Sequence, residues 1–380
     1  MKIIAGGVTK PLGFRANGLF CGIKRSGQLD LGLLISDKPG NGAAVFTRNS
    51  IKAAPLKVSE RHIRKNKVQA MIVNSGNANC FTGQFGLTYA ENTTEIIGKL
   101  LNIPQKTILV ASTGIIGRPL PYKKIANAAP HLVKGLNAQG GEKFAQAILT
   151  TDLKLKEIAV QFPLSGKKVT IGGCCKGSGM IAPNMATMLG FITTDAAIHP
   201  GLLKSALKKV TAETFNCITI DDCMSTNDMV AMMANGLAGN KEITSRDENF
   251  KKFYTALHYV CLDLAKKIVL DGEGATKFIT VKITGARTSP QAKTIALKIA
   301  NSNLVKTAAF GSNPNWGRVA AAAGSLGVKS ITEENLKINF SPFNKRDIEI
   351  HVDLNIGPGE STVYTCDLSY EYIRINGEYN

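Results

Sequence analysis

Several residue patterns are missing from this chain, and each absence excludes a class of protein. There is no CxxC pair and there are only five histidines, so the eight cysteines and the histidines form no recognisable zinc site. No stretch approaches about 18 consecutive apolar residues, which excludes a membrane-spanning helix. The first apolar run is too short for a signal peptide and is ended by Lys10 and Pro11. We therefore expect a cytoplasmic protein with reduced cysteines, no metal and no membrane partner.

Acidic residues are few beside basic ones, since 28 Asp and Glu stand against 46 Lys and Arg and give a net charge of +18. Such an excess raises the question of a nucleic-acid partner. The densest basic run, Arg61 to Lys67, contains no aromatic residue, and only 6% of the chain is aromatic. This pattern favours a solvated basic surface, or a basic cleft for a carboxylate substrate, over a nucleic-acid site. The alternative is a non-enzymatic basic protein whose binding falls steeply with salt.

The length of the chain predicts two domains, because 380 residues exceed the size at which one hydrophobic core usually stops growing. The hydrophobic content of 44% provides enough apolar material for a core. Apolar residues alternate over residues 278–283 and 348–354, as in strands. In the region before residue 275 the apolar residues instead have helical spacing. We place the boundary near residue 275, which gives a catalytic domain of residues 1–274 and a smaller α/β domain of residues 275–380.

Local periodicity predicts the first elements of the chain. Residues 1–60 are typical of short strands and turns. An apolar run over residues 68–73 predicts a buried strand, and the polar, small-residue segment 74–83 predicts a loop after it. Helical spacing follows over residues 87–101, and residues 108–111 again form a short apolar run. This order of strand, helix and strand indicates an α/β layer.

The stretch from Lys176 to Leu189, KGSGMIAPNMATML, concentrates the candidate chemistry. No GK[ST] closes its glycine-rich part as in a P-loop, and the GxGxxG spacing of a dinucleotide loop is absent. Thr187 follows the small Ala186, and a Thr hydroxyl can attack the preceding carbonyl through an N→O acyl shift. The new chain would begin with Thr187, whose α-amine has a reference pKa of about 7.7–8.0 and can serve as the base. On its own, this Ala-Thr pair also fits an ordinary turn before a buried strand.

Motifs along the whole chain give this hypothesis a wider context. The segment from Lys176 to Ala196 resembles the self-processing segment of the ornithine acetyltransferase family, the glutamate N-acetyltransferases of arginine biosynthesis. Further landmarks of that family occur in order: GGVTKPLGFRANG at 6–18, NSGNANCFTG at 74–83, STGIIG at 112–117, STNDMV at 225–230, DGEGATK at 271–277, LVKTAAFGSNPNWGR at 304–318 and YIRIN at 372–376. The resemblance covers essentially the whole chain.

The resemblance implies both a fold and a reaction. The implied fold is α/β, a layered α-β-β-α sandwich with a smaller C-terminal α/β domain, as in ornithine acetyltransferases and DmpA. After cleavage between Ala186 and Thr187, Thr187 would take the acetyl group from N-acetylornithine, ornithine would leave, and glutamate would accept the group. The family's oxyanion donors fall on the Thr113 hydroxyl and the Gly114 N–H, which otherwise fit a strand-ending turn. The alternative enzyme is an N-terminal-nucleophile amidohydrolase or aminopeptidase, which passes the acyl group to water.

The family's substrate contacts fall on Thr150, Lys176, Thr187, Glu273 and Asn376. Lys176 suits a substrate carboxylate, and Glu273 suits a substrate ammonium. Without the family, Thr150 fits a helix-ending polar residue and Lys176 a solvated loop lysine. Glu273 then fits a polar loop residue, and Asn376 a frayed terminal residue. The resemblance implies no cofactor, although acetyl-CoA serves some members as a further acetyl donor. It also implies α and β chains from one precursor, assembled into a heterotetramer or a larger oligomer.

Two departures from the family pattern concern local structure. Many members have a glycine where this chain has Asp222, which leaves the conformation of that turn open. The family usually has Thr or Ser five positions after the residue matched by Asn376, whereas this sequence ends at Asn380, one residue short. Either this substrate contact is missing, or the terminal carboxylate of Asn380 alters the site.

Overall fold

The computed structural model describes residues 1–182 and 188–378, and these residues form two compact units. The first unit contains the described residues of Met1–Gly177, Asn184–Thr214 and Ser225–Leu264. The second unit contains those of Ser178–Pro183, Phe215–Met224 and Ala265–Asn380. The chain therefore passes between the units several times, and the division proposed at residue 275 stays a prediction.

A nine-stranded mixed sheet organises the first unit, in the order β1-β6-β7-β8-β9-β3-β4-β5, with β2 paired to β3. The strands are β1 (Lys2–Ile4), β2 (Phe14–Leu19), β3 (Leu31–Phe46), β4 (Lys67–Asn77), β5 (Ile108–Ile115), β6 (Lys156–Leu164), β7 (Lys167–Lys176), β8 (Leu189–Thr194) and β9 (Met229–Ala234). The long strand β3 pairs with β2 and β4 in its first half and with β9 in its second, with a register shift between Ile35 and Gly40. It therefore joins two halves of the sheet.

The two halves of this sheet pack face to face. Leu34 on β3 and Met71 on β4 belong to the same buried cluster as Phe191 on β8 and Met233 on β9. Alternate residues of β3, such as Leu33, belong instead to a cluster with helices α2 and α3. Because side chains alternate across a strand, one face of this half therefore packs on β-structure and the other on helices.

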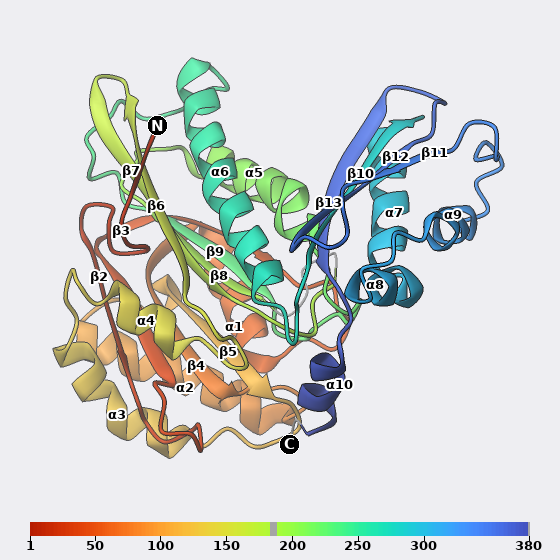
Figure 1. Cartoon of the computed structure of the whole chain (residues 1–380). Helices are drawn as coiled ribbons and strands as arrows, with labels where there is room; N and C mark the ends of the chain where they lie inside the picture. Colours follow the sequence, from red (N-terminus) through yellow and green to blue (C-terminus); the bar gives the residue numbers. More distant parts are fainter. Residues whose placement is uncertain (183–187, 379–380) are drawn as a thin grey trace. The chain divides into compact units, whose positions relative to one another are not determined.

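Helices cover the outer faces of both halves (Figure 1). The helices of this unit are α1 (Ala54–His62), α2 (Gly83–Leu101), α3 (Tyr122–Lys134), α4 (Gly141–Ala147), α5 (Pro200–Glu213) and α6 (Glu248–Leu270), with 3-10 turns at Ile63–Lys65 and Gln105–Thr107. The short helix α4 is the exception, because its Phe144 packs against Phe191 of β8 in the cluster between the two halves. The α6 helix lies so close to β7 that a Cβ added to Gly173 would be 3.0 Å from Leu264 and 3.2 Å from Val260. This layering of the first unit confirms the predicted α-β-β-α sandwich.

The second unit is built around a smaller four-stranded sheet in the order β11-β12-β10-β13. Its strands are β10 (Phe278–Ala286), β11 (Lys337–Phe340), β12 (Asp347–Asp353) and β13 (Gly359–Cys366), and its helices are α7 (Ser289–Ala300), α8 (Asn303–Phe310), α9 (Trp316–Gly324) and α10 (Tyr370–Gly377), with a 3-10 turn at Phe215–Cys217. Apolar residues of β10 and β12 pack with those of α7 in one buried cluster. The strands predicted from alternation over residues 278–283 and 348–354 are thereby confirmed.

Two local predictions differ from the structure, and one question that the sequence left open is answered. The N-terminal region contains a strand of 16 residues, β3, and the helix α1, where short strands and turns were expected. The predicted loop over residues 74–83 is strand up to Asn77, and α2 already begins at Gly83. Asp222 has a φ of 57°, in the region that favours glycine, and its side chain accepts a hydrogen bond from Asn301 Nδ2 at 2.7 Å. An aspartate therefore fits this turn.

In the part of the chain that the structure describes, no helix has the length and apolar character needed to cross a membrane.

Candidate active site

The predicted oxyanion donors lie inside strand β5, and the interpretation as a strand-ending turn is wrong. Thr113 is buried, and Gly114 has a φ of +129°, which favours glycine. A Cβ on Gly114 would lie 2.4 Å from the backbone of Gly76 on β4, so no larger residue fits there. The β4–β5 pairing is irregular at this point, since Asn77 faces both Thr113 and Ile115. Such bulges turn backbone groups away from the ladder and occur beside active sites.

Asn227, from the STNDMV motif, fixes this end of β5. Its Nδ2 donates to the carbonyl of Ser112 at 2.8 Å and to that of Ala78 at 2.6 Å. The Ser112 hydroxyl in turn donates to Asn74 Oδ1 at 2.6 Å. All these groups are buried, so their hydrogen bonds are made without competition from water. Asn227 therefore holds the backbone immediately before Thr113.

Asp228, the next residue, holds the backbone that follows the predicted nucleophile. Its Oδ1 accepts a hydrogen bond from the Met188 N–H at 2.9 Å, and both residues are buried. Ala186 and Thr187 themselves lie outside the described residues. Asn227 and Asp228 are neighbours in sequence. Through them, one short segment is hydrogen-bonded both to β5, which carries the predicted oxyanion donors, and to Met188, which follows Thr187.

Lys176 is the last residue of strand β7, and its side chain is buried. The alternative interpretation of Lys176 as a solvated loop lysine is therefore wrong. Its Nζ donates to Thr150 Oγ1 at 2.6 Å and lies 3.8 Å from Asp152 Oδ2. Asp152 also pairs with the buried Lys156 at 2.7 Å, and it accepts the backbone N–H of Gly177 at 2.7 Å. The structure thus brings together two predicted substrate contacts, Thr150 and Lys176, around a carboxylate that sequence reasoning did not assign.

The electrostatics of this cluster depend on Asp152. Burial alone would raise the pKa of Asp152, but the charges of Lys176 and Lys156 outweigh it and hold the pKa well below its usual range. Asp152 is therefore ionised at every working pH. With one carboxylate shared between two lysines, the cluster carries a net positive charge that suits a substrate carboxylate.

Lys24 lies beside the same region, although the sequence gave no reason to select it. Its Cγ would be 3.0 Å from a Cβ added to Gly76, the glycine that packs against Gly114. Burial lowers the pKa of Lys24 to about 8, and the nearby charge of Lys176 acts in the same direction while Asp30 opposes it. Asp30 accepts the backbone N–H of Lys24 at 2.9 Å and so fixes the loop that carries it.

The second unit holds the other two predicted substrate contacts as a pair. Glu273 is buried, and its Oε2 accepts a hydrogen bond from Asn376 Nδ2 at 2.9 Å. Asn376 lies in the helix α10, not in a frayed end, and Asn380 lies outside the described residues. A Cβ on Gly179 would be 2.2 Å from Glu273 Oε2, so the glycine leaves room for this carboxylate. The described candidates thus form two groups, one in each unit.

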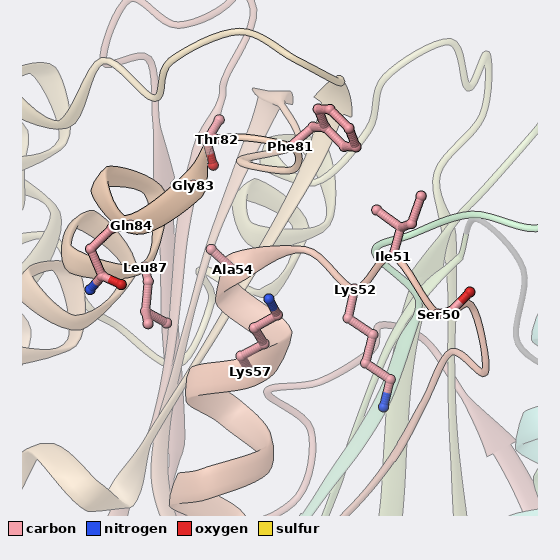
Figure 2. Close-up of a pocket in the computed structure, with 10 residues that line it drawn as sticks. All are labelled: Ser50, Ile51, Lys52, Ala54, Lys57, Phe81, Thr82, Gly83, Gln84 and Leu87. Carbon is pink, nitrogen blue, oxygen red and sulfur yellow. The ribbon is translucent and has the colours of Figure 1, made fainter.

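A separate surface pocket of about 280 Å³ lies between α1 and the start of α2. Figure 2 shows Lys57 on the α1 side of this pocket and Phe81 and Thr82 at the start of α2. Lys52, another lining residue, forms an ion pair with Glu60. None of the predicted site residues that the structure describes lines this pocket, so we do not include it in the candidate active site.

Comparisons with known proteins show which family this chain resembles along its length. The model of the ArgJ family matches residues 15–380. The "arginine biosynthesis bifunctional protein ArgJ" of Staphylococcus saprophyticus is 46% identical, with 99% of this chain and 96% of that protein covered. The protein of the same name from Geobacillus kaustophilus is 43% identical, with 98% and 96% covered. The solved ornithine acetyltransferase of Mycobacterium tuberculosis, complexed with ornithine, is 36% identical over 48% of this chain and 97% of that chain, with a TM-score of 0.45. This chain belongs to the ArgJ family.

Proposed function

We propose that this chain is a glutamate N-acetyltransferase of arginine biosynthesis, which cuts itself between Ala186 and Thr187 and then uses Thr187 as an acetyl carrier. The observation that carries the proposal is the Asn227–Asp228 pair. Asn227 binds the backbone before Thr113 at 2.8 Å, and Asp228 binds the backbone N–H after Thr187 at 2.9 Å. A nucleophile and its oxyanion donors must be held together in this way for acyl transfer.

The reaction follows a ping-pong course. The α-amine of Thr187, with a reference pKa of about 7.7–8.0, takes the proton of the Thr187 hydroxyl as the oxygen attacks the acetyl carbonyl. The Thr113 hydroxyl and the Gly114 N–H stabilise the oxyanion, and ornithine leaves after taking a proton. The amine of glutamate then attacks the acetyl-Thr187 ester and gives N-acetylglutamate. No cofactor takes part in these steps, and acetyl-CoA as an alternative donor stays a prediction.

Lys176 is proposed to bind a substrate carboxylate, and Lys176→Met tests this role. We expect the KM of N-acetylornithine to rise roughly 30-fold, because losing one partner of a buried charge pair costs about 2 kcal/mol or more. Steady-state kinetics of the acetyl transfer measure this change. The matched control is Lys306→Met, since Lys306 is equally buried but lies outside the Asp152 cluster and donates to Thr365 Oγ1 at 3.0 Å. This control should lower the melting temperature and leave KM close to wild type. Equal KM values for both variants would contradict the assignment.

Glu273 is proposed to bind the side-chain ammonium of N-acetylornithine. Glu273→Gln keeps the size of the side chain and removes its charge, so we expect the KM of N-acetylornithine to rise roughly tenfold. The KM of glutamate should change much less, because its side chain carries no ammonium. Steady-state kinetics in which the concentrations of N-acetylornithine and of glutamate are varied separately distinguish the two KM effects. Glu371→Gln, an exposed carboxylate on α10 that pairs with Arg374, is the control and should have no effect on either KM.

The test of the reaction class is a comparison of transfer and hydrolysis. Purified enzyme with N-acetylornithine should release one ornithine per active site without glutamate, should turn over further only when glutamate is present, and should then form N-acetylglutamate in equal amount. Rapid release of acetate without an acceptor would instead indicate the amidohydrolase alternative. A salt-sensitive nucleic-acid complex with no turnover would indicate the basic binding protein.

The assembly and location of the enzyme are further parts of the proposal. Cleavage gives an α chain of residues 1–186 and a β chain of residues 187–380, and we propose that these pairs form a heterotetramer or a larger oligomer. Mass measurement under native conditions checks this composition. We also propose that the enzyme acts in the cytoplasm.

A further inference from the structure

The helix α10 carries Asn376, one of the predicted substrate contacts, yet apolar packing does little to hold this helix. None of its eight residues is buried, and Tyr370 and Ile373 are 80% and 64% exposed. Burial of apolar side chains is the main force that fixes most helices on a domain, and segments with few such contacts open most easily. The place of Asn376 therefore depends on specific polar contacts of α10 with the rest of the second unit.

The first of these contacts fixes the start of α10 on the loop that carries Glu273. The Ser369 hydroxyl donates to the carbonyl of Gly274 at 2.7 Å and accepts the N–H of Tyr372 at 3.2 Å. Gly274 has a φ of +67°, and a Cβ there would lie 2.4 Å from the Tyr372 nitrogen. The first turn of the helix thus lies directly on the residue after Glu273. This contact leaves the last turn, with Asn376, to be fixed by others.

Tyr372 supplies a second contact through its side chain. Its hydroxyl donates to Asp221 Oδ2 at 3.1 Å. Asp221 is itself held in place, because its Oδ2 accepts the N–H of Met180 at 2.6 Å and its Oδ1 accepts that of Ile181 at 2.8 Å. Burial, followed by the charge of Asp221, raises the pKa of Tyr372 well above its usual range, so the hydroxyl stays protonated and donates. The helix is therefore tied to a carboxylate that backbone groups keep in position.

The same short segment, residues 178–181, also holds Glu273. The carbonyl of Ser178 accepts the N–H of Glu273 at 2.8 Å, and Gly179 leaves room for the Glu273 carboxylate. Glu273 and the Tyr372 hydroxyl are thus both positioned by residues 178–181, one directly and one through Asp221. This common support fixes α10 relative to Glu273.

The orientation of the Asn376 amide shows what this arrangement achieves. Its Nδ2 donates to Glu273 Oε2 at 2.9 Å and to the carbonyl of Tyr372 at 3.0 Å. Because both partners are acceptors, the amide nitrogen faces them and Oδ1 points the other way. Asn376 thereby adds an acceptor oxygen beside the Glu273 carboxylate. An ammonium group has three donors and no acceptor, so it suits this pair of acceptors.

We propose that Tyr372 is a positioning residue for donor selectivity, because its hydroxyl keeps Asn376 beside Glu273 for the side-chain ammonium of the acetyl donor. The inference rests on the proposed function, which assigns the ammonium to Glu273. Tyr372 acts through Asn376, and Asp221 is the fixed point to which Tyr372 is tied. Both belong to motifs to which the acetyl transfer gave no role.

Tyr372→Phe removes the hydroxyl and keeps the ring, and two donors measure its effect. N-acetylnorvaline lacks only the side-chain amine of N-acetylornithine, so the ratio of their kcat/KM values reports recognition of the ammonium. We expect this ratio to fall roughly fivefold, about the worth of one hydrogen bond, through a higher KM of N-acetylornithine at unchanged kcat. A general loss of stability would lower both kcat/KM values alike and leave the ratio unchanged. A wild-type ratio in Tyr372→Phe would overturn the proposal.

Tyr370→Phe is the matched control on the same helix. Tyr370 is 80% exposed, and its ring packs edge-on against Phe310 at 5.4 Å between centroids. Removing its hydroxyl keeps this ring contact, so the selectivity ratio and the melting temperature should stay those of wild type. An equal fall of the ratio in Tyr370→Phe would mean that any change in α10 has this effect, and the specific role of Tyr372 would be wrong.

A double variant tests whether Tyr372 acts through Asn376. Asn376→Ala should lower the selectivity ratio by itself, and adding Tyr372→Phe to it should lower the ratio no further. A further fivefold fall in the double variant would contradict the proposed route. Glu273→Gln separates this inference from the proposed function. If Glu273→Gln keeps the wild-type ratio, the assignment of the ammonium fails. If Glu273→Gln lowers the ratio and Tyr372→Phe does not, only the role of Tyr372 fails.

Discussion

Thr187→Ala should give a single full-length band of 40.6 kDa and no measurable acetyl transfer. The substitution removes the hydroxyl that attacks Ala186, so the chain stays whole. It also removes the oxygen that carries the acetyl group, so the transfer rate should fall by at least about 10⁴-fold, as expected for a lost nucleophile. Denaturing gels measure the first effect, and release of ornithine measures the second.

Two further variants control this prediction. Thr187→Ser keeps a hydroxyl and should still be cut and still transfer acetyl, with altered rates. Thr193 is a buried threonine on the same strand, β8, where its hydroxyl donates to the carbonyl of Val8 at 2.7 Å. Thr193→Ala should therefore lose stability but be cut normally. A Thr187→Ala chain that is still cut at residue 186, or still transfers acetyl, would contradict the assignment of the nucleophile.

Thr113→Ala should lower kcat about 10²–10³-fold, the usual cost of removing one oxyanion donor. The KM of N-acetylornithine should change little, because the oxyanion exists only in the transition state. Thr113 is held in β5 by the hydrogen bond from Asn227 to the preceding carbonyl at 2.8 Å, so the backbone has little reason to move. Steady-state kinetics with both substrates check this separation of kcat from KM.

Thr113→Ser is the matched control, since it keeps the hydroxyl and removes only a methyl group. We expect its kcat to stay within about tenfold of wild type, because only the precision of the donor changes. A Thr113→Ala enzyme with wild-type kcat would exclude the hydroxyl as an oxyanion donor. An equal loss of kcat in both variants would indicate that the methyl group and packing matter instead.

The sequence predicted the fold best where periodicity is simple. The alternating residues 348–354 lie in the strand β12 up to residue 353, and the helical spacing over residues 87–101 lies within α2. It failed for β3, whose middle, DKPGNG at residues 37–42, has the composition of a turn. Tertiary pairing decides the conformation there, because β3 bends at a register shift and continues as a strand against β9. The helix α1 was missed although Pro55 stands at its first turn, where proline is favoured.

The candidate site shows a similar limit. The resemblance identified Thr150, Lys176, Glu273 and Asn376, and the structure pairs Lys176 with Thr150 and Glu273 with Asn376. The two carboxyls that organise the first unit, Asp152 and Asp228, stayed unassigned. Both stand inside quoted motifs, TTD and STNDMV, but their roles depend on partners 24 and 40 residues away in sequence. Only the folded chain shows these contacts.

The self-made acetyl carrier at Thr187 is tested most directly by intact mass spectrometry of the purified wild-type protein. We predict two chains, residues 1–186 and 187–380, each about half of 40.6 kDa. After brief exposure to N-acetylornithine, only the chain that begins with Thr187 should gain the mass of one acetyl group, and addition of glutamate should remove it. An active enzyme that consists of one uncut chain, or that carries the acetyl group on residues 1–186, would contradict this mechanism.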